Sequence, residues 1–143
     1  MSITQFFDNT LDAPLVNQLW SWGAVTRDGK RLALRVWAHE TLARDGNGKR
    51  WVAIDWPMRP AEQLSAGAPE RTSHVALLRA GMPTVGVMCT AIATTNVVKK
   101  IESFDRERLF VFDPEVVEME GLLWASYSRI IQPREFKALV ANS

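Results

Sequence analysis

Tryptophan is the residue type whose number and spacing in this chain point most clearly to a chemical role. The 143 residues include six tryptophans but only one tyrosine. The tryptophans are Trp20, Trp22, Trp37, Trp51, Trp56 and Trp124. Because stacking on an aromatic ring is worth about 1 to 3 kcal/mol per base, two well-placed indoles could hold one flat nucleobase. The simpler alternative is that all six rings pack under flanking helices, as large apolar side chains generally do.

Strand alternation places an arginine and a tryptophan on the same face of one expected strand. Residues 31–39 alternate so that Arg35 and Trp37 oppose the leucines and the valine that mark the core side. A large aromatic surface beside a guanidinium is costly to leave uncovered, and a planar ligand would cover it. The sequence therefore predicts a base-binding site, with Cys89 as a further polar group of the cavity. Its expected residues are Trp22, Trp37, Trp20, Ser21, Arg35, Asp55 and Trp56.

Basic residues in turns and loops are candidates for phosphate contacts. They are Arg27, Lys30, Lys99 and Lys100. Acidic residues are interleaved with them, so a solvated surface of mixed charge is the alternative interpretation. The formal net charge of the chain is only +1, which excludes a strong overall attraction to nucleic acid or to an anionic membrane. Binding of nucleic acid would depend on a local patch.

The sequence carries no recognised catalytic or metal-binding motif. His39 and His74 stand far apart, and a single cysteine, Cys89, excludes an intramolecular disulfide and a zinc site built from cysteines. Neither a Gly-x-Ser-x-Gly nucleophile motif nor a Gly-x-x-x-x-Gly-Lys phosphate loop occurs. We expect no catalytic residue, no bound metal and no cofactor.

Two alternatives to a base-binding role remain open. Glu135 and Lys137 have the Glu-x-Lys spacing of many metal-dependent nucleases, and Asp113 or Asp55 could supply a third carboxylate. The chain could instead be a nucleotide hydrolase. A different class of function is a small-molecule sensor or assembly subunit, in which exposed tryptophans form a protein interface.

Length and composition indicate one domain over residues 1–143. A chain of this size, with 47% hydrophobic and 23% charged residues, is typical of an ordinary globular protein with a real core. The N-terminus lacks a basic start followed by an apolar run, and no apolar stretch approaches 18 residues. We therefore expect a cytoplasmic protein with no membrane contact.

The pattern of residues predicts a sheet of about six strands with two or three flanking helices. Residues 18–25 and 31–39 flank Asp28-Gly29, which is typical of a tight type I′ turn, and residues 50–56 would complete an antiparallel meander. Further strands are expected at 85–92, which would be central, at 108–112 and at 122–131, with a turn at Glu120-Gly121, and residues 113–119 could add a short edge strand. Helices are expected at 15–17, at 71–80 before Gly81, and at 134–140, with a loop at 57–70. These elements predict an α+β fold, mostly an antiparallel curled sheet or open β-barrel.

Two stretches of the chain resemble a known superfamily. One runs from Gln18 to Val25 and on to Leu34-Arg35-Val36-Trp37, and the other runs from Arg71 through Gly81 and Gly86-Val87-Met88-Cys89-Thr90-Ala91 to Lys100-Ile101-Glu102-Ser103-Phe104. In pattern and in order of elements they resemble PUA-like domains, the superfamily of the EVE, YTH and SRA base readers found with bacterial restriction-type nucleases. The resemblance spans about 110 residues and includes no diagnostic motif.

The resemblance implies a non-catalytic module that reads a modified base turned out of a nucleic-acid strand. The pocket aromatics would correspond to Trp22 and Trp37, with Trp20 or Trp56 as substitutes. The expected partners are nucleic acid, with DNA carrying a modified base as the first candidate, and a partner nuclease in restriction or phage defence. The chain departs from such domains in its near-neutral charge, which puts unaided affinity for DNA in doubt.

Overall fold

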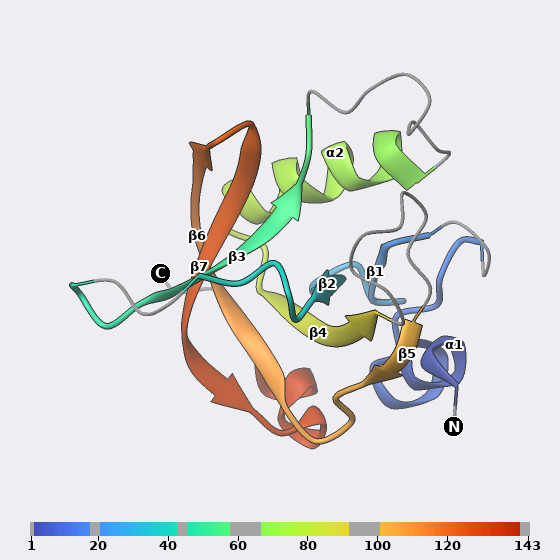
Figure 1. The fold of residues 1–143 in the computed structure, drawn as a ribbon. Coiled ribbons are helices and arrows are strands. Elements are labelled where there is room, and N and C mark those ends of the chain that lie inside the picture. Colours follow the sequence, from blue (N-terminus) through green and yellow to red (C-terminus); the bar gives the residue numbers. More distant parts are fainter. Residues whose placement is uncertain (1, 18–20, 43–45, 58–66, 92–100, 141–143) are drawn as a thin grey trace.

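The computed structural model describes residues 2–17, 21–42, 46–57, 67–91 and 101–140 of the chain. Its strands form one seven-stranded sheet in the order β1-β2-β4-β6-β7-β3, with β5 beside β4 (Figure 1). The strands are β1 (Gly23–Val25), β2 (Leu32–Trp37), β3 (Arg50–Asp55), β4 (Thr84–Ala91), β5 (Ile101–Phe104), β6 (Leu109–Met119) and β7 (Leu122–Ile131). The helical segments are α1 (Ile3–Gln5), a π-helix at Phe6–Thr10, α2 (Gly67–Arg79) and a 3₁₀ helix at Pro133–Ala138.

The two faces of β2 belong to two different hydrophobic cores. Leu32, Leu34 and Val36 pack in one core with Val75 and Leu78 of α2. Ala33 packs on the other face, in a core that the two ends of the chain complete. The alternation expected for β2 is therefore confirmed. In Figure 1, α2 and the N-terminal helical segment accordingly lie on opposite sides of β2 and β4.

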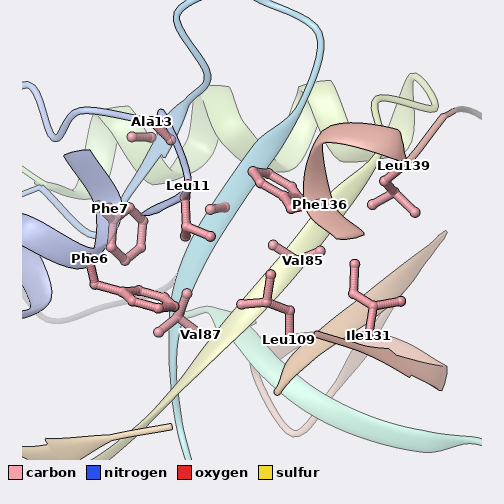
Figure 2. Close-up of a cluster of buried hydrophobic side chains, with 12 residues drawn as sticks. Phe6, Phe7, Leu11, Ala13, Val85, Val87, Leu109, Ile131, Phe136 and Leu139 are labelled. Carbon is pink, nitrogen blue, oxygen red and sulfur yellow. The ribbon is translucent and has the colours of Figure 1, made fainter. Parts of the chain in front are cut away.

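The second core joins the N-terminal and C-terminal segments across the sheet (Figure 2). Phe6 and Phe7 come from the N-terminal helical segment, and Phe136 comes from the 3₁₀ helix. All three rings are at most 2% exposed, and they meet over Val85 and Val87 of β4. Burying a side chain of this size contributes about 1.5 to 3 kcal/mol, so this cluster anchors both ends of the chain on the sheet.

The turn of the first hairpin differs from the expected type. A type I′ turn needs positive φ at both central residues, but only Gly29 has one, at 74°. The turn instead closes with a hydrogen bond of 2.8 Å from Gly29 N to Thr26 O, and the carboxylate of Asp28 accepts from the Thr26 hydroxyl at 2.6 Å. Because Asp28 does not have a positive φ, the expected type I′ turn is wrong, although the β1–β2 hairpin is confirmed.

The expected three-stranded meander is wrong. β2 pairs with β4 in parallel, and β3 pairs with β7. The segment after β2 reaches β3 through Thr41, which forms an isolated antiparallel bridge with Val52. The sheet is thus mixed and not closed, and of the six pairings between its described strands, five are antiparallel and one is parallel. The expected α+β class and the central place of β4 are confirmed.

The helices do not begin at the residues that the sequence predicts. No helix forms at 15–17; the first helix begins after Ser2, whose hydroxyl accepts from Gln5 N while the Gln5 side chain accepts from Ser2 N. α2 begins at Gly67, inside the expected loop, and ends as expected before Gly81, whose φ is 99°. The C-terminal helix is a 3₁₀ helix.

One strand, β5, was not expected. The expected strand at 108–112 and the short edge strand considered at 113–119 form a single strand, β6, which continues to Met119 past irregularities in its register with β7. The turn expected at Glu120-Gly121 joins β6 to β7, and both of its residues have a positive φ. In the part of the chain that the structure describes, no helix is long and apolar enough to cross a membrane.

Candidate functional site

One buried guanidinium on α2 brings the ends of three strands together. Arg71 is 4% exposed, and its Nη2 donates to the carbonyl oxygens of Trp22 at 2.8 Å and Arg35 at 2.9 Å. Its Nη1 donates to the carbonyl oxygen of Ile54. Strands β2 and β3 and the residue before β1 are therefore all bonded to a single side chain, although β2 and β3 are not neighbours in the sheet.

The neighbouring residue on α2 holds the segment that leads into β1. The carboxylate of Glu70 accepts from the Ser21 hydroxyl at 3.1 Å and from the backbone N–H of Trp22 at 3.3 Å. The Ser21 oxygen also accepts from Asn17 N at 2.9 Å, and Ser21 is fully buried. Ser21 therefore helps to position this segment, and its hydroxyl is already used within the protein.

Arg35 lies on the face of β2 away from α2, together with Trp37. Its Nη1 donates to the carbonyl oxygen of Ser21 at 2.9 Å, and its guanidinium lies close to the thiol of Cys89. Burial lowers the pKa of the guanidinium, which stays charged at physiological pH because arginine is so basic. Within the described residues, no carboxylate lies within 4 Å of it. Arg35 is thus a half-buried cation with no anionic partner in the part of the chain that the structure describes.

Two indoles at this end of the hairpin are only partly covered. Trp22 and Trp37 both remain half-buried, and the Arg71 guanidinium carbon lies 5.8 Å from the centre of the Trp22 ring. The Trp37 ring lies 6.1 Å from that of His39, between ring centres. Two aromatic rings and a cation therefore occupy the end of β1–β2 opposite its turn.

Of the other predicted base-binding residues, Asp55 and Trp56 lie at the end of β3 that is bonded to Arg71. Asp55 and Trp56 directly follow Ile54, the acceptor of Arg71 on β3, and the Asp55 carboxylate accepts from Trp56 N at 2.9 Å. Trp20 lies outside the described residues. Ser21, Trp22, Arg35, Asp55 and Trp56 thus all lie within two residues of a backbone carbonyl that accepts from Arg71, and Trp37 follows two residues after Arg35.

The remaining tryptophans are not part of this arrangement. Trp124 is 6% exposed, and its indole N–H donates to the carbonyl oxygen of Met119 at 3.1 Å. It packs within the β6–β7 hairpin, as a tryptophan with a purely structural role would. Trp51 lies half-buried on β3, opposite Ser126 of β7.

The predicted phosphate contacts do not surround the aromatic residues. Arg27 and Lys30 lie in the turn of β1–β2, and β2 runs about 16 Å from Leu32 to Trp37 at the usual rise per residue. Arg27 is also paired with the carboxylates of Asp8 and Asp12. Lys99 and Lys100 lie outside the described residues.

Comparison of the chain with protein-family models, curated proteins and solved structures found no significant match. No relative identifies it as a PUA-like domain. Its function must be argued from its own side chains.

The residues of the nuclease alternative are separated in the structure. The Glu135 carboxylate accepts from Gln132 N at 2.6 Å and so caps the 3₁₀ helix. The carboxylate of Asp113 accepts from the Ser126 hydroxyl at 2.8 Å and lies 3.7 Å from Lys49 Nζ. Among the described residues, no three His, Cys, Asp or Glu side chains are grouped so that they could hold a metal ion.

The sequence predictions missed Glu70 and Arg71 as residues of the site. A signal was present, because Arg71 shares the helical spacing of His74, Val75 and Leu78, the residues that α2 buries. A charged residue in an apolar stripe predicts a buried charge with partners. Those partners are backbone carbonyls on strands far away in the sequence, which no local pattern shows.

Proposed function

We propose that the chain is a non-catalytic nucleic-acid-binding module that receives a flat base beside Trp22 and Trp37. The observation that carries the proposal is Arg35, a half-buried cation without a carboxylate partner in the described structure. It is on the same face of β2 as the partly exposed Trp37, and its backbone N–H donates to the carbonyl oxygen of the partly exposed Trp22 at 2.7 Å. A base supplies both a flat face for an indole and oxygen or nitrogen acceptors for a guanidinium. A modified base in DNA is the first candidate for the ligand.

The surrounding contacts support a site that is built before the ligand arrives. Arg71 fixes the backbones of Trp22 and Arg35, and Glu70 fixes the backbone N–H of Trp22. Ordering these strand ends in advance reduces the conformational entropy that binding would otherwise cost. In this arrangement Trp22, Trp37 and Arg35 contact the base, and Ser21, Glu70 and Arg71 position them.

A PUA-like fold is the finer part of the same proposal. A mixed, open sheet with a helix packed over one face is compatible with it. The near-neutral charge of the chain favours weak binding alone and stronger binding beside a partner nuclease.

The test is fluorescence anisotropy with labelled single-stranded and duplex oligonucleotides, with and without a modified base, at low ionic strength. We expect Trp22→Ala and Trp37→Ala each to weaken binding by about tenfold, the effect of losing one stacking contact. Arg79→Gln removes an exposed cation at the far end of α2 and is the matched control, expected to bind like the parent chain.

Three results would overturn the proposal. They are no binding of any oligonucleotide, equal affinity in the parent chain and in both tryptophan variants, or cleavage of the oligonucleotide on addition of Mg²⁺. Circular dichroism of each variant checks that weaker binding is not caused by unfolding.

A further inference from the structure

A hollow lies at the turn end of the β1–β2 hairpin, away from the candidate base-binding site. It has a volume of about 260 Å³ and is lined by residues of the turn, of the N-terminal segment and of the 3₁₀ helix. Leu11 and Phe136, neighbours in the core of Figure 2, form its apolar part. The volume is just below the usual 300 to 1,000 Å³ of small-molecule pockets, so it suits a compact ligand.

The carboxylates on the wall of this groove are already bound within the protein. Asp12 pairs with Arg27. Asp28 accepts from the Thr26 hydroxyl at 2.6 Å and from Lys30 N at 3.0 Å, and these bonds lower the pKa of its carboxyl group. Both acids are thus engaged as structural acceptors.

Two of the three guanidinium nitrogens of Arg31 are bonded to other residues at the groove. Its side chain is only 13% exposed, Nε donates to the carbonyl oxygen of Leu139 at 2.7 Å, and Nη1 lies 3.2 Å from Asp28 Oδ2. In the described part of the chain, Nη2 of Arg31 has no hydrogen-bond partner. A nearly buried guanidinium therefore offers a fixed donor at the groove.

Two lysines add positive charge at the rim. Lys30 and Lys137 are exposed and line the groove from the turn and from the 3₁₀ helix. Neither ammonium group has a carboxylate within 4 Å among the described residues. The lining thus holds three cations against two carboxylates, and both carboxylates are occupied.

We propose that this groove is an anion site that takes a phosphate group, held by Arg31 Nη2 and by the ammonium groups of Lys30 and Lys137. Arginine and lysine together are the usual donors to phosphate oxygens. The phosphate can come from a free phosphorylated small molecule or from the end of a nucleic-acid strand. The site does not depend on the base-binding proposal, because it lies at the other end of the hairpin and contains no tryptophan.

The test is an NMR titration of the ¹⁵N-labelled chain with inorganic phosphate and pyrophosphate, at an ionic strength held constant with sodium chloride. We expect saturable shifts of the backbone amide signals of Gly29, Lys30 and Lys137. The double variant Lys30→Gln/Lys137→Gln should bind about tenfold more weakly, since each ammonium contributes a charge-assisted hydrogen bond. Arg79→Gln/Arg129→Gln, two exposed cations outside the groove lining, removes the same charge and should leave the affinity unchanged.

Amide shifts that do not saturate, or equal affinity in the two double variants, would overturn the site. Exposed lysines are chosen because their replacement leaves the bond from Arg31 to Leu139 intact.

A comparison of a 5′-phosphorylated dinucleotide with its 5′-hydroxyl counterpart identifies the source of the phosphate group. Tighter binding of the phosphorylated dinucleotide than of inorganic phosphate supports a strand end, and equal binding supports a free phosphate compound. Loss of oligonucleotide binding in Trp22→Ala with phosphate binding retained separates the two sites.

Discussion

The Nη2 nitrogen of Arg71 donates a hydrogen bond of 2.9 Å to the backbone carbonyl oxygen of Arg35. The bond joins α2 to β2 at Arg35, whose own side chain is on the same face of β2 as Trp37, away from α2. The stability of the fold and the geometry of the candidate site therefore depend on the same side chain.

Replacing Arg71 should destabilise the protein strongly. Arg71→Met keeps most of the side-chain volume but removes a donor from three backbone carbonyl oxygens, of which that of Trp22 still accepts from Arg35 N. Because a buried acceptor left without its donor costs about 1 to 3 kcal/mol, the free energy of unfolding in urea should fall by at least that amount. Arg79→Met, at the exposed end of the same helix, should change it by less than about 0.5 kcal/mol. Equal effects of the two changes would show that the bonds of Arg71 contribute nothing to stability.

A methyl group at Gly86 should also destabilise the fold. A Cβ there would lie 2.8 Å from the Phe112 ring and 3.2 Å from Val36 Cγ2, inside the core under α2. Overpacking of this kind costs about 1 to 3 kcal/mol, so Gly86→Ala should lower the thermal midpoint by several degrees. Gly46→Ala is the control, because nothing lies within 4 Å of the added methyl. An unchanged midpoint in Gly86→Ala would mean that β4 and β6 are not packed as described.

The stability of the protein should fall between pH 7 and pH 4.5 in part because of His74. Burial, and next the nearby Arg71 charge, lower the pKa of this imidazole from 6.5 to about 4. Below about pH 6.5 the unfolded chain therefore binds a proton at His74, whereas the folded chain binds it only below about pH 4. The contribution of His74 to the free energy of unfolding is thus fully present above pH 6.5 and is lost as the pH falls toward 4.

The variant His74→Gln isolates this contribution from the titration of the carboxylates. Urea unfolding at the two pH values should show a smaller loss of stability in the variant than in the parent chain, by on the order of 2 kcal/mol. His39→Gln, which replaces an exposed imidazole, should behave like the parent chain. An identical loss in His74→Gln and the parent would contradict the buried, neutral state of His74.

The single thiol should be unreactive in the folded protein. Cys89 is 1% exposed, and burial raises the pKa of its thiol to about 11, against an opposing effect of the Arg35 guanidinium. Because the thiolate is the reactive form, a thiol reagent such as 5,5′-dithiobis(2-nitrobenzoate) should label it slowly at pH 8 and completely in denaturant. Rapid labelling of the native chain would show that this face of β4 is open.

The parts of the fold that the sequence predicts are those set by neighbouring residues. Alternation along 31–39 assigned Arg35 and Trp37 to the face away from the leucines, and the structure confirms the two faces of β2. Gly81 marks the end of α2 as expected. Both signals depend on residues within one turn or one strand.

The parts that the sequence did not predict depend on contacts between distant segments. β2 pairs in parallel with β4, which begins about 50 residues later along the chain, and nothing local in residues 31–39 distinguishes that partner from β3. The place of Arg71 in the site is also non-local, because its three acceptors lie 17 to 49 residues away. The candidate site was therefore predictable in its residue types but not in the helix that holds it together.

The indole N–H signals of the tryptophans test the base-binding account most directly. In an NMR titration with an oligonucleotide that carries the best-bound base, the indole signals of Trp22 and Trp37 should shift and saturate together. The signal of Trp124, whose N–H is bonded to Met119 within the β6–β7 hairpin, should stay in place as an internal reference. Saturable shifts of Trp22 and Trp37 alone are the result that the account predicts. Unmoved signals of both residues at saturating oligonucleotide, or equal shifts of all the tryptophans, would contradict it.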